Sequence, residues 1–158
     1  MHKLDDKPAV NRYLAAESDT LALGGDLATG IKPGMVIYLS GDLGTGKTTL
    51  ARGIIRGLGY TGKVKSPSFT LVEVYKFSRL YLYHFDFYRI NNPREFGEAG
   101  LREYFDSEAV CLVEWPERAA GVPAADLRIV LRIAGAGRNV EIFAESEAGR
   151  VCLRHVRH

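Results

Sequence analysis

Unbroken runs of apolar residues mark two segments of the chain and predict buried parallel strands. Residues 35–39 (Met-Val-Ile-Tyr-Leu) and 109–113 (Ala-Val-Cys-Leu-Val) are the clearest of these runs. Parallel strands have this appearance because helices and loops cover both of their faces. Between the two runs, apolar residues recur at helical spacing over 47–58, and Gly59 follows as a stop. The pattern therefore predicts an α/β core.

Alternation of apolar with polar or aromatic residues predicts antiparallel strands in addition to this core. Residues 71–77 and 80–85 flank a short turn and are rich in Val, Leu, Tyr and Phe, which is typical of a hairpin. A second alternating pair lies at 127–133 and 140–142, with the turn Ala-Gly-Ala-Gly at 134–137 between them. We expect a parallel sheet core with antiparallel strand additions.

Two further segments are predicted to be helical. Ser18 and Asp19 can cap a helix that runs to about Ile31, with its leucines four residues apart on one face. The polar stretch 92–105, which opens on Asn92-Pro93, also favours helix. Inside the helix at 47–58, two glycines each cost about 1 kcal/mol relative to alanine.

Composition narrows the class of protein mainly by exclusion. The 158 residues are 46% hydrophobic and 25% charged, close to the averages of globular proteins, which excludes a disordered chain or a coiled coil. This length predicts one domain over 1–158. A net charge of +2 is too small to indicate a nucleic-acid-binding protein by itself.

The cysteines and the N-terminal residues indicate where the protein works. Cys111 and Cys152 cannot form a disulfide framework or a zinc site alone, so we expect reduced, buried thiols. Residues 1–7 lack the apolar core of a signal peptide, and no stretch has the roughly 18 apolar residues of a membrane span. The sequence predicts a soluble, cytoplasmic protein with no membrane partner.

The strongest chemical signal is the motif G-x-x-x-x-G-K-[S/T] at 41–48. Glycines let the backbone curl so that its N–H groups point at phosphate oxygens, and the following helix adds the positive end of its dipole. Lys47 can reach the β- and γ-phosphates of ATP, and the Thr48 hydroxyl can ligate Mg²⁺. The motif lies between an apolar strand and a helix, which is the context that it needs. The residues predicted to bind the nucleotide are Asp42, Leu43, Gly44, Thr45, Gly46, Lys47, Thr48 and Thr49.

Two carboxylates are candidates for the metal and water of such a site. Glu114 ends the apolar run at 109–113, as a Walker B acid does, and Asp86 ends the run that begins at Tyr81. Ligands of open α/β sheets bind at this carboxyl edge. In a regular strand, His84, Asp86 and Tyr88 share one face. We expect at least one of the two acids to serve the metal.

Four blocks in this order resemble the TsaE (also called YjeE) family, the ATPase subunit of bacterial tRNA threonylcarbamoyladenosine biosynthesis. They lie at 39–49, 64–72, 83–89 and 112–115, and include Ser-Pro-x-Phe and His-Phe-Asp-x-Tyr-Arg. Together they span about half of the chain. The sequence differs from the family pattern in two places, since Thr45 replaces an alanine of the P-loop and Ser68 replaces the threonine of Ser-Pro-Thr.

The resemblance implies a three-layer P-loop NTPase-like fold and roles for particular residues. It implies a nucleotide-sensing segment near the γ-phosphate at 66–70, a Mg²⁺–water cluster at Asp86 and Glu114, and functional sensitivity at Trp115. The resulting assignments are Lys47, Asp86 and Glu114 as catalytic residues, Thr48 and Glu114 as metal ligands, and Ser66, Ser68, Thr70 and Trp115 as further site residues.

The resemblance also implies a division of labour. A pair of proteins, TsaB and TsaD, carries the transfer of the threonylcarbamoyl group to adenosine 37 of tRNA. The TsaE-like subunit binds that pair and hydrolyses ATP slowly, to reset it between turnovers. Contact with tRNA is then indirect, through the complex. The cofactors implied are ATP and Mg²⁺.

Other interpretations of the same residues remain open at this point. A P-loop small-molecule kinase is the alternative function, although the segment after the P-loop helix lacks an arginine-rich lid. An RNA-binding protein would use aromatic rings for stacking and a basic face formed by Arg52, Arg56, Lys63 and Lys65. A solvated face and a packed core are the simpler explanations of these residues. His84 is interpreted as a structural hydrogen-bonding residue rather than a base, and Trp115 as either core or contact.

Overall fold

The computed structural model describes residues 7–156, so the polar residues at 1–6, used above to argue against a signal peptide, lie outside it. The elements in chain order are β1 (Val10–Leu14), α1 (Glu17–Ala28), β2 (Val36–Ser40), α2 (Lys47–Gly57), β3 (Val72–Lys76), β4 (Tyr81–Asp86), α3 (Glu95–Glu98), the 3₁₀ helix η2 (Leu101–Tyr104), β5 (Ala109–Glu114), the 3₁₀ helix η3 (Pro116–Arg118), β6 (Leu127–Ala134), β7 (Gly137–Ala144) and α4 (Glu147–Leu153).

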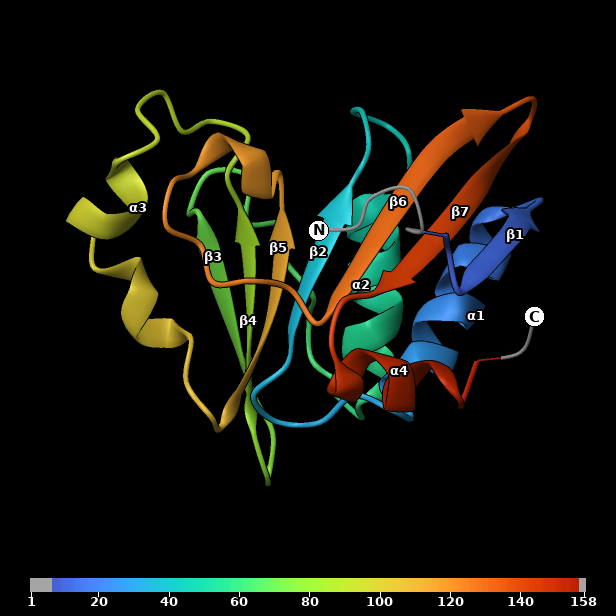
Figure 1. Cartoon of the computed structure of the whole chain (residues 1–158), viewed down its shortest axis with the longest axis horizontal. Helices are drawn as coiled ribbons and strands as arrows, with labels where there is room; N and C mark the ends of the chain where they lie inside the picture. Colours follow the sequence, from blue (N-terminus) through green and yellow to red (C-terminus); the bar gives the residue numbers. More distant parts are fainter. Residues whose placement is uncertain (1–6, 157–158) are drawn as a thin grey trace.

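All these strands form a seven-stranded sheet in the order β1-β7-β6-β2-β5-β4-β3. The central pairs β6–β2, β2–β5 and β5–β4 are parallel. The outer pairs β1–β7, β7–β6 and β4–β3 are antiparallel. This confirms the predicted parallel core with antiparallel additions. Figure 1 shows the twist of the sheet, with β3 near one edge and β1 at the other.

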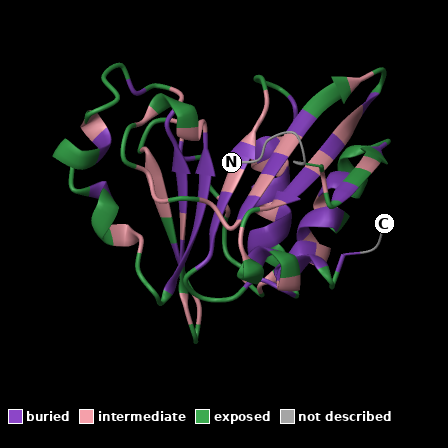
Figure 2. Ribbon diagram, viewed as in Figure 1, coloured by how far each residue is buried: buried purple, intermediate pink, exposed green. Residues whose placement is uncertain are grey.

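Helices α1 and α2 cover one face of the sheet and enclose an aliphatic core (Figures 1 and 2). Leu27 of α1, Ile54 of α2 and Leu112 of β5 are fully buried there. The two helices approach closely because glycines meet: a Cβ atom on Gly53 would lie 2.6 Å from the carbonyl oxygen of Leu21. The helix-weakening glycines of α2 therefore have a packing role.

The opposite face around β4 and β5 is packed with aromatic rings. Phe85 and Phe87 are buried beside Phe96 of α3, with ring centroids 5.6 Å apart in both neighbouring pairs. The stretch 92–105, predicted to be helical, forms only the short turns α3 and η2, because Gly100 takes a left-handed conformation (φ 72°) between them. These two short helices lie beside the β3–β4 edge in Figure 1.

Three further elements differ from the sequence-based predictions. The cap of α1 is Ala16 rather than Ser18, and the carboxylate of Asp19 accepts the Ala16 N–H at 2.9 Å, so the helix begins at Glu17. Strand β1 and helix α4 were not predicted. Helix α4 begins at Glu147 and is capped by Ser146, whose hydroxyl accepts the Gly149 N–H. Within residues 7–156, no helix has the length and apolar character needed to cross a membrane.

Candidate functional site

The carboxyl ends of the parallel strands open into a cleft of about 730 Å³. Its floor is the loop between β2 and α2, and one wall is formed by the ends of β4 and β5 together with the segment around Ser66. The other wall comes from the segment between β1 and α1 and from the start of β7. The lining residues are Leu14, Ala15, Ala16, Glu17, Thr20, Leu43, Gly44, Thr45, Gly46, Lys47, Thr48, Thr49, Ser66, Ser68, Asp86, Tyr88, Arg89, Glu114, Trp115, Ala136, Gly137 and Arg138.

Glycine is required where the loop between β2 and α2 curls. Gly41 has φ 143° and Gly46 has φ 103°, values that residues with side chains rarely adopt. A Cβ atom on Gly41 would also collide with the carbonyl oxygen of Leu131 in β6. Helix α2 starts directly after Gly46, so its free N–H groups face the cleft. The loop is therefore shaped to surround an anion.

Lys47 is held inside this loop and is only 5% exposed. Its ammonium group donates to the carbonyl oxygen of Gly41, donates to that of Asp42 at 3.0 Å, and lies 4.4 Å from the centre of the Trp115 ring. Burial lowers the pKa of Lys47, and the nearby charges of Glu114 and Asp86 act in the opposite direction. The lysine is a positive charge at the floor of the cleft.

Asp86 and Glu114 lie side by side because β4 and β5 are parallel neighbours with these two residues paired in register. Glu114 is 2% exposed and accepts the Thr48 hydroxyl at 3.2 Å. Asp86 accepts the N–H of Tyr88 at 3.0 Å. Burial raises the pKa of Asp86 and the charge of Glu114 adds to that rise, while the Tyr88 N–H opposes it. Two carboxylates thus face one lysine and one threonine across a small space.

The donor set fits Mg²⁺ carried by a nucleotide better than a metal bound by protein alone. Mg²⁺ prefers oxygen ligands and usually keeps waters and phosphates beside one or two protein groups. Thr48 and Glu114 supply such oxygens at the start of α2 and the end of β5. Within residues 7–156 there is no cluster of three or more His, Cys, Asp or Glu side chains that could hold a metal ion.

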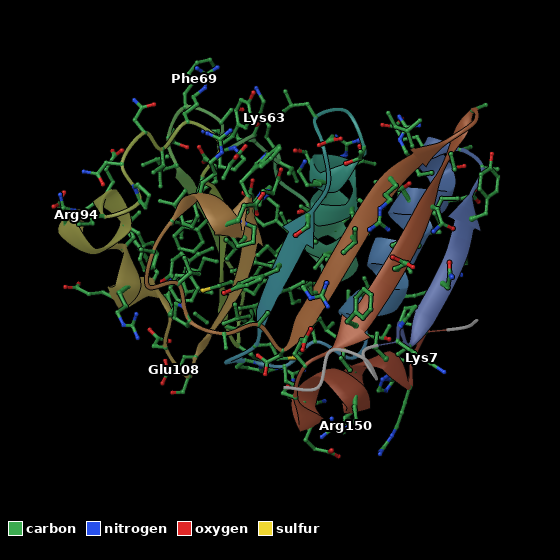
Figure 3. All side chains as sticks on the ribbon, turned by 45° about the horizontal axis from the view of Figure 1, so that its top comes forward. Lys7, Lys63, Phe69, Arg94, Glu108 and Arg150 are labelled. Atoms are coloured by element: carbon green, nitrogen blue, oxygen red, sulfur yellow. The ribbon has the colours of Figure 1, made fainter. Side chains whose placement is uncertain are left out.

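The segment predicted to sense the nucleotide is only partly at the cleft. Ser66 and Ser68 line it, with their hydroxyl oxygens 2.5 Å apart. Thr70 does not line it, and its hydroxyl donates to Glu73 at 2.9 Å. Phe69 is 83% exposed and projects outward (Figure 3). The Arg89 guanidinium lies 4.6 Å from the centre of the Phe69 ring. Leu71, at the end of the segment, has a strained φ of 70°.

Asp42 contributes to the site through its backbone, and Trp115 contributes through its ring. Asp42 does not line the cleft, but its carbonyl oxygen accepts from Lys47 and from the Thr45 hydroxyl at 2.8 Å. Trp115 lines the cleft with a left-handed backbone (φ 58°) and packs against Tyr88 with ring centroids 4.9 Å apart. Since it is half-buried, Trp115 is a wall of the cleft rather than part of the closed core.

Sequence reasoning missed the wall that comes from the antiparallel half of the sheet. Arg138 of β7 donates to the carbonyl oxygen of Gly44 at 2.9 Å, which links β7 to the loop between β2 and α2. Glu17 lines the same wall and accepts from Arg52 at 3.4 Å. No local motif marks these residues, because they reach the cleft through tertiary contacts. Strand β1 pairs with β7, where Leu14 lies opposite Arg138, and helix α1 packs against α2.

Fold and site together define the class of protein. A buried strand, a glycine loop, a helix that opens on Lys47-Thr48, and an acid at the end of the neighbouring parallel strand are the parts of a P-loop protein. The model of the family described as "Threonylcarbamoyl adenosine biosynthesis protein TsaE" matches residues 14–140. The chain belongs to the TsaE family, as the resemblance indicated.

Similar proteins support this membership over most of the chain. A TsaE protein of Haemophilus influenzae is 44% identical over 117 residues, which are 73% of this chain and 74% of that protein. A TsaE protein of Bacillus subtilis is 44% identical over 118 residues, 74% and 73% of the two chains. The crystal structure of Bacillus subtilis YdiB has 35% identity and a TM-score of 0.75, covering 92% of this chain and 91% of that one.

Proposed function

We propose that this chain is a P-loop ATPase domain that binds Mg²⁺–ATP, hydrolyses it slowly, and serves threonylcarbamoyladenosine formation in tRNA together with TsaB-like and TsaD-like proteins. The relatives named above are tRNA threonylcarbamoyladenosine biosynthesis proteins. The observation that carries the proposal is the meeting of Lys47, Thr48, Asp86 and Glu114 in one cleft. The proposed location is the cytoplasm, with tRNA contacted through the complex.

Nucleotide binding is assigned to the loop and the start of α2. The N–H groups from Leu43 to Thr49 supply donors for the phosphates, and the helix dipole adds to them. Lys47, which donates to two loop carbonyls, would exchange these for phosphate oxygens. Thr48 and Glu114 would hold Mg²⁺, which supplies charge neutralisation between the phosphates. Ser66 and Ser68, at the opposite wall, are the proposed sensors of the γ-phosphate.

The two carboxylates are proposed to have different roles. Glu114 touches the Thr48 hydroxyl and thus belongs to the metal side of the cleft. Asp86 forms no hydrogen bond with Thr48, and its carboxylate instead accepts the N–H of Tyr88, at the start of the segment that carries Arg89. We therefore assign Asp86 to orienting the attacking water. Asp86→Asn should keep Mg²⁺–ATP binding and lose hydrolysis, whereas Glu114→Gln should raise the Mg²⁺ requirement; titrating Mg²⁺ while following binding and turnover separately tests the assignment.

The arrangement of the arginines supports the proposal that the isolated chain hydrolyses ATP slowly. Of the described residues that line the cleft, the arginines are Arg89 and Arg138. Arg89 stacks on Phe69, and Arg138 bonds to the carbonyl oxygen of Gly44. Both guanidinium groups are thus engaged with protein groups, and an arginine at the transferring phosphate contributes about 10³–10⁵ in rate. A partner protein would supply or reorder the missing charge.

Binding to the partner proteins in the presence of ATP and of ADP tests the proposal. We expect the wild-type chain to bind purified TsaB-like and TsaD-like proteins in a nucleotide-dependent manner, and its ATP hydrolysis to rise when they are added. Lys47→Ala should lose both responses, whereas Lys63→Ala, a change at an exposed lysine outside the cleft, should keep them. Fast hydrolysis by the chain alone, or transfer of phosphate to a small acceptor, would instead support the kinase alternative.

A further inference from the structure

His84 is the buried polar residue that the proposed function leaves without a role. It lies on β4 two residues before Asp86 and is fully buried. Its Nε2 lies 2.7 Å from Oε2 of Glu114. The other ring nitrogen, Nδ1, is buried with no hydrogen-bond partner among the described residues. In the described part of the chain, the carboxylate of Glu114 is therefore the one hydrogen-bonding partner of the ring.

This geometry assigns the direction of the hydrogen bond. A carboxylate only accepts hydrogen bonds, so the ring proton must reside on Nε2. His84 does not line the cleft and its Nε2 is already engaged, so it has no access to a substrate or a water there. This geometry favours a role other than general base. What the ring can do is act on Glu114.

Glu114 needs such a partner because few other groups hold it. Within residues 7–156, the partner of this carboxylate besides His84 is the Thr48 hydroxyl, which donates at 3.2 Å. The carboxylate of Asp86 is its neighbour in register, and like charges at this spacing repel. The His84 ring approaches from the β4 side, two residues deeper in the sheet. It can therefore hold the carboxylate in the direction of Thr48, where the metal is proposed to bind.

We propose that His84 is a positioning residue that fixes Glu114 toward Thr48 and thereby sets the Mg²⁺ concentration that nucleotide binding requires. The inference rests on the proposed Mg²⁺–ATP site. Partners that orient a metal ligand in this way typically change metal affinity 10–100-fold when they are removed. The effect should fall on the Mg²⁺ dependence and leave metal-free binding of the nucleotide unchanged.

Two substitutions of similar size separate positioning from packing. In His84→Gln the side-chain amide nitrogen can reach the place of the ring Nε2, whereas in His84→Asn it reaches only the place of Nδ1. ATP binding is measured by calorimetry over a range of Mg²⁺ concentrations and without Mg²⁺. We expect His84→Asn to raise about tenfold the Mg²⁺ concentration at which half of the Mg²⁺-dependent gain in ATP affinity is reached. In His84→Gln this Mg²⁺ concentration should stay near the wild-type value. Equal Mg²⁺ requirements in both variants would overturn the proposal.

A spectroscopic measurement on the wild-type chain removes the dependence on how the variants fold. Long-range ¹H–¹⁵N correlation spectra of the histidine rings distinguish protonated Nε2 from protonated Nδ1. We expect the proton on Nε2 of His84, and a changed Nε2 resonance in Glu114→Gln. A proton on Nδ1 with a bare Nε2 would overturn the pairing. A wild-type chain that shows the pairing but binds no ATP would refute the proposed function itself, which distinguishes the two failures.

Discussion

On one face of the sheet, aliphatic side chains meet two long helices that touch at glycine; on the other, aromatic rings support short helical turns. Strands β4 and β5 contribute to both. Leu82 and Leu112 point to the helices α1 and α2, whereas Phe85 and Val113 point to the aromatic cluster around Phe96. Side chains alternate between the two faces, as in any strand, yet the two faces contribute different groups to the cleft.

The helix-covered face carries the proposed chemistry. His84, Asp86 and Glu114 lie on the same face of their strands as Leu82 and Leu112. Asp86 and Glu114 reach the cleft near the start of α2, whereas His84 is buried two residues before Asp86. The aromatic face instead supplies the rim of the cleft, since Tyr88 and Trp115 follow the same strands and pack against each other there with tilted rings. The comparison predicts that substitutions on the aromatic face reduce stability more than ATP binding. Substitutions on the helix-covered face can instead reduce ATP binding more than stability.

The largest expected effect is on stability, from Phe96→Ala. Phe96 is 1% exposed and contacts Phe87 and Phe105 edge to face, so its removal leaves a cavity that costs about 3–5 kcal/mol. Denaturant unfolding measures the loss. The folded variant should bind ATP with nearly unchanged affinity. Phe69→Ala is the control, because Phe69 is 83% exposed and should change the free energy of unfolding by no more than about 0.5 kcal/mol.

Lys47→Ala should show the opposite profile. The change removes the positive charge at the floor of the cleft, and a charged hydrogen-bonding partner is worth roughly 1.5–3 kcal/mol, so ATP affinity should fall about 100-fold. The unfolding midpoint should move far less than in Phe96→Ala, since burial of the ammonium group is itself unfavourable. Fluorescence of Trp115, the only tryptophan of the chain, can report binding. An unchanged ATP affinity in Lys47→Ala would contradict the assignment of this loop as a P-loop.

Gly53→Ala tests the close contact of the helices behind the cleft. The new methyl group would lie 2.6 Å from the Leu21 carbonyl oxygen, and overpacking of this kind costs about 1–3 kcal/mol, although alanine favours helix. The matched control is Gly25→Ala in α1, where no atom lies within 4 Å of the added Cβ. We expect thermal unfolding to show a loss of stability in Gly53→Ala. In Gly25→Ala the free energy of unfolding should rise by up to about 1 kcal/mol. Equal effects would mean that the helices can move apart freely.

The smallest effect, and the one that depends on pH, concerns Asp86. Its pKa is raised in the folded chain, above all by burial, so the ionised carboxylate destabilises the fold at neutral pH. Asp86→Asn should therefore raise the melting temperature by a few degrees at neutral pH. The gain should disappear as the pH falls through the raised pKa, because the wild-type carboxyl then becomes neutral as well. Glu108→Gln, which removes the same charge from an exposed position, should show no such gain.

Much of the fold follows from local pattern, and the exceptions have physical reasons. The unbroken apolar runs predicted β2 and β5, since buried parallel strands need apolar residues on both faces. Strand β1 was missed because Arg12 interrupts its apolar face and only pairing with the distant β7 stabilises it. The stretch 92–105 was predicted as helix, but glycine and the aromatic packing break it into short turns.

The residues of the candidate site also include some that the sequence predicted and some that it could not. Lys47, Thr48, Asp86 and Glu114 were predicted because each stands in a motif or ends a strand, and parallel strands bring such ends together. Arg138 and Glu17 could not be predicted, since they reach the cleft through contacts between segments far apart in the chain. The contact of His84 with Glu114 depends on which strands are neighbours, and the sequence indicated only a hydrogen-bonding histidine.

Calorimetric titration of ATP into the wild-type chain, with and without Mg²⁺, tests most directly whether the cleft is a Mg²⁺–ATP site. We expect one ATP per chain, with an affinity that increases when Mg²⁺ is present. Thr48→Ala and Glu114→Gln should need more Mg²⁺ to reach the same affinity, because each removes an oxygen from the proposed metal position. Absence of binding to the wild-type chain, or binding that neither Mg²⁺ nor these substitutions change, would contradict the account.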